Sequence, residues 1–380
     1  MGSECLASPV TTRVWLLCAL LTQLWACGGE PEEIETVELQ EPAEPEAEEG
    51  DEERPSRQEL FTRSRPLMGT VFIIKVDAEP AVAAPAIDDA FEEIARLEDV
   101  LSEWRPDSEI SRINQNAGQS PVQVGEDVFR VVKAGVDVSR WSRGAFDLSW
   151  AALRGLYDFR PGRQRVPDRS EVRPRLRHID YRKIRLDEEA RTVFLEDEGM
   201  AIGTGGIAKG YALDRAGRIL REAGIESYML FGGGQVQVYG MRGDRPWRVG
   251  IQHPRNESTY FAFFESDGGS ISTSGDYERV FVDSRGKRWH HILDPRTGLP
   301  VERTMSVTLL APDGLHADAL STAAFVLGPR RALEMFARID YRAEAVMVDD
   351  RCRMFATPGT EERLQMRVEL DRRNTLPECE

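Results

Sequence analysis

The 380-residue sequence is poor in cysteine: it has five, with no CxxC pair and no cluster of histidine and cysteine. This scarcity argues against a zinc site built on thiolates. Its longest apolar run near the N-terminus, VWLLCALL, is too short for a helix that spans a membrane. The sequence also lacks an internal repeat, and 49 Lys and Arg are outnumbered by 65 Asp and Glu, which gives a formal net charge of −16.

Most of that negative charge lies in one segment, since residues 30–53 hold thirteen acidic residues and no basic one. Without these thirteen, the net charge of −16 falls to −3. A protein that binds duplexes or polyphosphates should carry a basic field over its folded part. We therefore expect no nucleic-acid partner. The hydrophobic content of 41% still allows a large core, in one large or two smaller domains.

The N-terminus has the pattern of a targeting segment, because Arg13 precedes the apolar run. The run ends in LWAC, which resembles the bacterial lipobox. That resemblance predicts a signal peptide over residues 1–26 and a lipidated Cys27 as the mature N-terminus. A plain secretory signal is the alternative. Gly28, in place of the Asp that usually retains lipoproteins at the inner membrane, slightly favours the outer membrane, so we expect an envelope lipoprotein that faces the periplasm.

Residues 27–64 are rich in Glu, Pro and Ala and should form a disordered acidic tether. We place the folded domain at residues 65–380. Two cysteines lie in this domain, Cys352 and Cys379, and they could form one disulfide, although the sequence does not fix the distance between them.

Residues 270–300 contain the densest group of hydroxyls, charges and turn formers in the chain. The apolar residues alternate as in strands, and DPRTG predicts a turn because Pro295 fixes φ and Gly298 tolerates a positive φ. This segment is either a wall of an active site or an ordinary hairpin whose polar residues face water.

Two further stretches suggest ligand binding. GTGGIAKGYALD places a glycine-rich loop before a helix, where backbone N–H groups can meet an anion, although it matches neither a P-loop nor a dinucleotide fingerprint. Three glycines at residues 232–234 predict a strand bulge or a group bound flat on the backbone. Asp318 and Thr322 lie four residues apart on a predicted helix and could offer oxygen ligands to Mg²⁺. The alternative is a surface Asp and a Thr bonded to its own helix.

Eight ordered blocks between about Pro66 and Gly328 resemble the ApbE family, the FAD:protein FMN transferases: LMGT, SEWRPDSEISRIN, GAFD, GGIAKGYALD, GGG, TSGDYER, HHILDPRTG and ADALSTA. The resemblance implies an α+β fold related to the T-fold, with mixed, largely antiparallel sheets and packed helices. It also implies transfer of FMN from FAD to a Thr or Ser hydroxyl of an exported electron-transfer protein, with release of AMP and with Mg²⁺ at the diphosphate.

The resemblance also assigns residues. Those expected to contact FAD are Met68, Trp104, Ala145, Phe146, Asp147, Gly203, Lys209 and Ile292. The metal would be held by the side chains of Asp318 and Thr322 and by the carbonyl of Gly206. His291 is our candidate for the base that deprotonates the acceptor, or it positions a phosphate, while Asp276 and Asp294 are secondary catalytic candidates.

Several of these assignments have alternatives. Trp104, where the family usually has Tyr, could be a core residue, and Asp147 could cap the following helix. Gly203 stands where the family commonly has an acidic residue, so one flavin contact could be absent or made by the backbone. Gln235 stands where Asp or Asn is common. Two other functions stay open: a hydrolase that splits FAD into FMN and AMP, and a lipoprotein that binds flavin without turnover.

Overall fold

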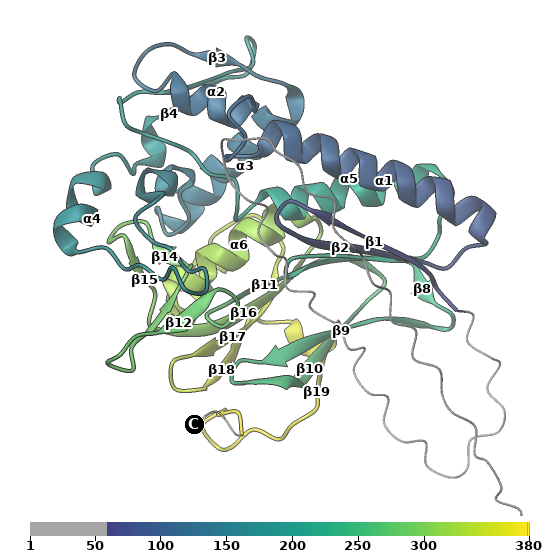
Figure 1. The fold of residues 1–380 in the computed structure, drawn as a ribbon. Helices are drawn as coiled ribbons and strands as arrows, with labels where there is room; N and C mark the ends of the chain where they lie inside the picture. The colour runs from purple at the N-terminus through teal and green to yellow at the C-terminus, as the bar shows by residue number, and fades with distance from the viewer. Residues whose placement is uncertain (1–58, 378, 380) are drawn as a thin grey trace, which may run out of the picture. The chain divides into compact units, whose positions relative to one another are not determined.

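A single antiparallel sheet forms the centre of the computed structural model, which describes residues 59–377 and 379 (Figure 1). All of its neighbouring strands pair antiparallel. In spatial order the eight strands are β1 Phe61–Leu67, β2 Thr70–Val76, β6 Tyr228–Gly232, β7 Gln235–Tyr239, β11 Gly268–Gly275, β16 Thr304–Ala311, β17 Glu344–Asp349 and β18 Met354–Ala356.

Three helices cover one face of this sheet, and they are α1 Pro80–Leu101, α5 Ala208–Glu222 and α6 Gly314–Leu327 (Figure 1). Helix α1 buries Ile87, Phe91 and Ile94 completely, and their three- and four-residue spacing puts them on one face of the helix. These side chains join the inward residues of β2, where Phe72 and Ile74 alternate with less buried neighbours. The main hydrophobic core therefore lies between helices and sheet.

A smaller sheet packs through a second apolar cluster that includes Trp247, Phe261 and Phe264 together with residues of β11, β16 and β17. Its strands are β19 Leu364–Met366, β10 Asn256–Ser266, β9 Arg245–His253 and β8 Met241–Arg242. Because β16 and β17 contribute to both clusters, every residue of these two strands is buried. In β16 the buried residues include Thr304, Ser306 and Thr308, which alternate with apolar side chains.

The remaining elements are the 17-residue helix α3 and a set of short helices, turns and strands. The helices are α2 Glu109–Gln115, α3 Glu126–Ser142, α4 Arg169–Leu176 and α7 Pro329–Phe336, and the 3-10 turns are η1 Leu148–Leu153, η2 Tyr181–Lys183 and η3 Thr360–Glu362. The short strands are β3 Val122–Gln123, β4 Ile184–Asp187, β5 Thr192–Leu195, β12 Val280–Val282, β13 Arg288–His290, β14 Leu293–Asp294 and β15 Leu299–Pro300. Within the described part of the chain, no helix is both long and apolar enough to cross a bilayer.

The α+β fold and its antiparallel sheets agree with the sequence prediction, but two local predictions do not. The first strand begins at Phe61, before the expected domain start at residue 65, because β1 and β2 form a hairpin whose tip is Met68 and Gly69. The three glycines form another hairpin tip instead of a strand bulge: Gly233 and Gly234 have φ of 56° and 82° and join β6 to β7. Two successive positive φ values are what a tight two-residue hairpin requires.

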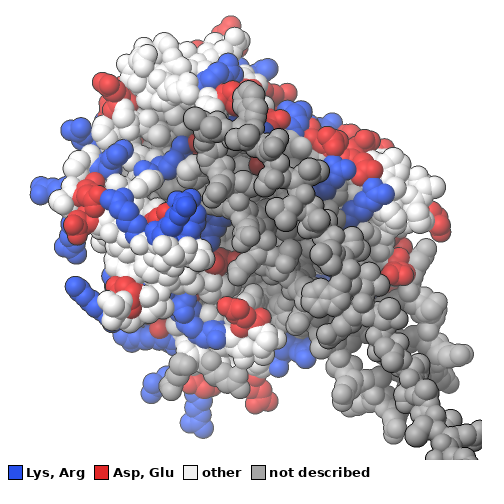
Figure 2. Space-filling model, in the orientation of Figure 1, with Lys and Arg blue, Asp and Glu red and all other residues white. Residues whose placement is uncertain are grey.

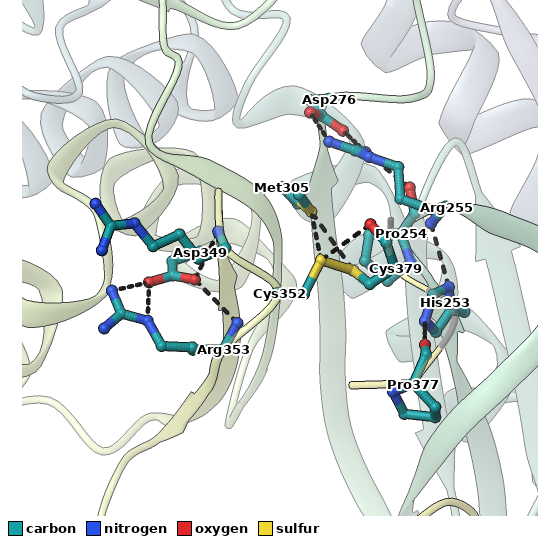
Figure 3. The surroundings of a disulfide bond; sticks show 11 residues. His253, Pro254, Arg255, Asp276, Met305, Asp349, Cys352, Arg353, Pro377 and Cys379 are labelled. Atoms are coloured by element: carbon teal, nitrogen blue, oxygen red, sulfur yellow. Dashed lines mark hydrogen bonds and ion pairs between the residues drawn. A yellow bond between two sulfur atoms is a disulfide. The ribbon is translucent and has the colours of Figure 1, made fainter. Parts of the chain in front are cut away.

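A disulfide between Cys352 and Cys379 fastens the C-terminal segment (Figure 3). Both cysteines are buried beside Met305, and the carbonyl of Pro377 lies 2.9 Å from Nε2 of His253 in β9. The pairing that the sequence left open is thus present. The signal peptide, Cys27 and the acidic tether lie outside the described residues.

Candidate active site

The glycine-rich loop before α5 places its backbone carbonyls next to the charged side chains of Lys209 and Asp318. Nζ of Lys209 donates to the carbonyl of Gly205 at 2.7 Å and lies 3.9 Å from Oδ2 of Asp318. The side chain of Lys209 also passes the hairpin tip of β6 and β7, where a Cβ added at Gly233 would meet its Cδ at 3.0 Å. Lysine, loop and α6 therefore meet at one place.

Asp318 is the buried carboxylate of this place, with 3% of its surface exposed. Its Oδ2 accepts the N–H of Gly210 at 3.1 Å, and its Oδ1 accepts the amide of Gln235 at 3.1 Å. Burial raises the pKa of Asp318, while Lys209 and the backbone donors act in the opposite direction. The surface-Asp alternative is wrong, because this carboxylate is enclosed and held from two elements.

Hydroxyl groups extend the oxygen-rich surface along β11 and α6. Oγ of Ser321 lies 2.8 Å from Oγ of Ser272 and 2.9 Å from Oγ of Ser274. Oγ of Ser274 is in turn 3.4 Å from Oγ1 of Thr322. Ser274, which lies in the polar segment 270–300, thus joins that segment to the predicted metal-binding helix α6.

The three residues predicted to hold the metal lie on α6 and in the glycine loop next to it. Asp318 and Thr322 are one turn apart on α6, and a Cβ built at Gly206 would lie 3.5 Å from Oγ1 of Thr322. A carboxylate, a hydroxyl and a carbonyl are the ligand types that hard cations prefer. The residues therefore fit Mg²⁺ in donor chemistry. Among the described residues no group of three His, Cys, Asp or Glu gathers, so this site would rest on one carboxylate.

The two adjacent histidines have opposite surroundings. His290 is buried, with its Nε2 2.6 Å from the carbonyl of Val301 and its Nδ1 accepting the N–H of Ile292. His291 is exposed, and its backbone N–H donates to the carbonyl of Arg279. Ile292 is buried again, so the strand pattern of the sequence holds here.

The surroundings of His291 keep its imidazole neutral. Desolvation and the positive charges of Arg279 and Lys209 lower its pKa from the ordinary value of 6.5. Because the residue is exposed, we attribute the shift to the two cations rather than to burial. A neutral imidazole at the surface can accept a proton from a hydroxyl of a second protein.

Neither secondary catalytic candidate contacts His291 through a side chain in the described structure. Asp276 pairs with Arg255 through both carboxylate oxygens, at 2.7 and 2.8 Å. Asp294 pairs with Arg296 in the same way and accepts backbone N–H groups of its own turn. Their geometry supports structural roles, in fixing the β9–β10 connection and the DPRTG turn.

The GAFD segment is buried next to this region. Phe146 lies under the glycine loop, since a Cβ at Gly206 would meet its Cε2 at 3.3 Å. Ala145 is buried as well. Asp147 accepts the N–H and Oγ of Ser149 and the N–H of Tyr181, and only 5% of it is exposed. The capping alternative thus describes the contacts of Asp147, while Phe146 is the member of this segment closest to the glycine loop.

The model of the ApbE family matches residues 68–347. The chain belongs to the ApbE family. An FAD:protein FMN transferase of Klebsiella pneumoniae is 34% identical over 271 residues, which are 71% of this chain and 83% of that protein. One of Treponema pallidum is 31% identical over 346 residues, covering 86% and 87% of the two chains.

Solved structures of ApbE proteins share the fold. The ApbE protein of Thermotoga maritima superposes with a TM-score of 0.74 at 30% identity, over 80% of this chain and 99% of that one. The flavin transferase ApbE of Vibrio cholerae gives a TM-score of 0.72 at 28% identity over the same shares.

Two ApbE site predictions fall on the α1–α2 connection and the glycine loop. Trp104 is 73% exposed, so the core alternative for it is wrong. Its ring lies 4.9 Å from the guanidinium of Arg154. Gly203 carries no side chain to contact a ligand, and the carboxylate of Glu103 lies against it. Sequence reasoning missed Glu103 and Arg154, because nothing in their spacing shows that the two segments meet.

Basic side chains gather on the face that carries α4, β14 and β15 (Figure 2). A cavity of about 320 Å³ lies at this face, and Asp147 belongs to its lining together with Arg143, Tyr181, Arg182 and Arg296. The arginine-rich run of residues 160–175 extends into the capped helix α4. This surface borders the DPRTG turn, since the hydroxyl of Tyr157 donates to the carbonyl of Gly298.

Proposed function

We propose that this chain is an FAD:protein FMN transferase that moves FMN from FAD onto a Thr or Ser hydroxyl of a partner protein and releases AMP. The observation that carries the proposal is the convergence of Gly206, Asp318 and Thr322 beside Lys209. The names of its ApbE relatives support the coarser statement, transfer of FMN from FAD to a protein. Phosphoryl transfer to a macromolecule needs buried oxygen ligands that hold a cation at the diphosphate, and an exposed base that the acceptor can reach.

Asp318, Thr322 and the carbonyl of Gly206 would hold Mg²⁺, which when bound neutralises negative charge on the diphosphate. The chain's own residues prepare this place. Gln235 and the N–H of Gly210 fix the Asp318 carboxylate, and Ser274 orients Thr322. Lys209 adds a positive charge at the same edge.

The transfer itself needs one proton acceptor. The acceptor hydroxyl oxygen forms a bond to the FMN phosphorus, the bond from that phosphorus to the oxygen bridging to AMP breaks, and AMP leaves with the bridging oxygen. The proton of the hydroxyl passes to the neutral imidazole of His291, which stands exposed where a second protein can reach it. The buried neighbour His290 is held by Val301 and takes no part.

The test uses the full chain in detergent with FAD, Mg²⁺ and a candidate acceptor domain, and follows the acceptor mass and free AMP together. We expect a mass increase of one FMN and an equal amount of AMP. Release of AMP without an acceptor, and no labelled acceptor, would instead establish hydrolysis. Tight FAD binding without AMP under all conditions would establish a flavin-binding protein and refute both reactions.

Anchoring is a separate part of the proposal. We propose that the chain is cleaved before Cys27, lipidated there and held in the bacterial envelope facing the periplasm, with the outer membrane slightly favoured. The support is the LWAC sequence and the glycine that follows it. Mass spectrometry of the mature N-terminus should find a diacylglyceryl group on Cys27. A soluble protein with an unmodified N-terminus would contradict it, and Cys27→Ser serves as the matched control.

A further inference from the structure

Glu103 is a buried carboxylate in the connection between α1 and α2, with 7% of its surface exposed. Its Oε2 accepts the N–H of Thr204 at 2.9 Å, and the hydroxyl of Thr204 donates to the carbonyl of Leu101 at 2.7 Å. These two bonds join segments about one hundred residues apart. They fix the start of the glycine loop whose later residue Gly206 lies beside Thr322.

The glycine at position 203 is explained by this carboxylate. Gly203 does not have a positive φ, so its backbone conformation does not require glycine. A Cβ at this position would instead lie 2.2 Å from Oε2 of Glu103, and 3.1 Å from both Nε1 of Trp150 and Cβ of Ala151. Any side chain at 203 therefore has to push the carboxylate of Glu103 out of its place.

Arg154 links the same carboxylate to the exposed Trp104. Its Nη1 donates to the backbone carbonyl of Glu103 at 2.7 Å, and its Nη2 lies 3.6 Å from Oε2. The guanidinium sits 4.9 Å from the centre of the Trp104 ring, within the range of a cation–π contact. Within the described residues Nε and Nη2 of Arg154 are buried without a hydrogen-bond partner, so the ion pair with Glu103 is what offsets its charge.

We propose that Glu103 is a positioning residue for FAD: its carboxylate holds the glycine loop at Thr204 and, through Arg154, holds the ring of Trp104, and Gly203 is the space that this carboxylate needs. The inference rests on the proposed function, because it takes the loop and the ring to be parts of the FAD site. Glu103 itself touches neither the reacting atoms nor the proposed metal ligands in the structure.

The test measures FAD affinity and hydrogen exchange of the Thr204 amide in Glu103→Ala, Gly203→Ala and the double variant. Each single change should weaken FAD binding about tenfold, the usual scale for losing a buried hydrogen bond to a charged group. The FAD affinity of the double variant should fall by no more than about tenfold, because each change removes the same contact between the Glu103 carboxylate and Thr204. Glu103→Gln keeps an oxygen that can accept from Thr204 and should restore affinity to within about threefold of the wild type.

The control is Glu109→Ala, which removes a carboxylate that accepts the N–H of Gly125 at 2.6 Å. This variant should leave FAD affinity unchanged. Additive losses in the double variant, or wild-type affinity in Glu103→Ala, would overturn the proposal. Hydrogen exchange of the Thr204 amide can be measured without flavin. Unchanged exchange in Glu103→Ala therefore overturns the positioning role even if no variant binds FAD. Faster exchange in this variant, together with no FMN transfer by the wild type, refutes only the transferase function.

Discussion

The candidate site has a buried side, at Asp318, and an exposed side, at His291, and the two residues differ in the contacts that fix their positions. Asp318 is buried on α6, and a backbone N–H and a side-chain amide occupy its two oxygens. His291 is exposed in the bend between β13 and β14, where its backbone N–H donates to the carbonyl of Arg279. A preformed buried side suits a small, highly charged ligand, while an exposed side suits the surface of another protein. Under the proposed function, the buried side would bind the dinucleotide and the exposed side would meet the acceptor protein.

The largest effect is expected from the buried side. Asp318→Ala should lower metal-dependent transfer on the order of a thousandfold or more, because it removes the single carboxylate of the proposed cation site. Asp318→Asn keeps the shape and should fold with wild-type thermal stability while losing transfer similarly. Titration of Mg²⁺ against initial rates of AMP release measures this. Normal turnover in either variant would show that the metal is bound elsewhere.

The exposed side should produce a smaller loss. His291→Ala removes the proposed base and should lower transfer about a hundredfold at saturating FAD, with little change in FAD affinity. Single-turnover rates together with equilibrium binding separate the two quantities. His178→Ala, a histidine that contacts Arg177, is the control and should transfer at the wild-type rate. Loss of FAD affinity in His291→Ala, with an unchanged rate constant, would assign His291 to phosphate binding instead.

Charge next to His291 should set the acidic limit of the reaction. The proposed base works when it is neutral, so transfer is lost as the pH falls through the pKa of His291, which the cations hold below 6.5. Arg279→Gln removes one cation, raises that pKa and should shift the acidic limb of the pH–rate profile upward by up to about one unit. Arg285→Gln, in the same hairpin, should shift it less. If the acidic limb of the pH–rate profile is unchanged in Arg279→Gln, a group other than His291 sets that limb.

The smallest effect on transfer should come from the disulfide, which lies outside both sides of the site. Replacing Cys352 and Cys379 by Ser opens a loop with a sequence separation of 27 residues. The free energy of unfolding should fall by about 3 to 4 kcal/mol, because the unfolded chain regains entropy. Urea unfolding measures this, and transfer by the folded enzyme should be unchanged. A loss of transfer in conditions where the variant is fully folded would connect the C-terminal segment to catalysis.

Much of the fold follows from local pattern. The spacing of Ile87, Phe91 and Ile94 predicts α1. The family resemblance supplied the set of Gly206, Asp318 and Thr322, and the fold brings these residues together. Local periodicity and turn chemistry are encoded in neighbouring residues, so they can be read directly.

What could not be predicted depends on contacts between distant segments. Asp276 and Asp294 stand in the densest polar stretch, yet their oxygens bind Arg255 and Arg296, and no local signal distinguishes a structural ion pair from a catalytic carboxylate. The role of Gln235 against Asp318 likewise requires β7 and α6 to be in place. Glycines were misread at residues 232–234 because a bulge and a hairpin tip require similar φ values.

The space at Gly203 also constrains how this chain can change in evolution. A relative with any side chain at that position has no room for a carboxylate placed as Glu103 is here, so the two positions should exchange together or not at all. In the folded protein, a side chain at position 203 and the carboxylate of Glu103 would occupy the same space. A side-chain group at this location can therefore come from either segment of the chain.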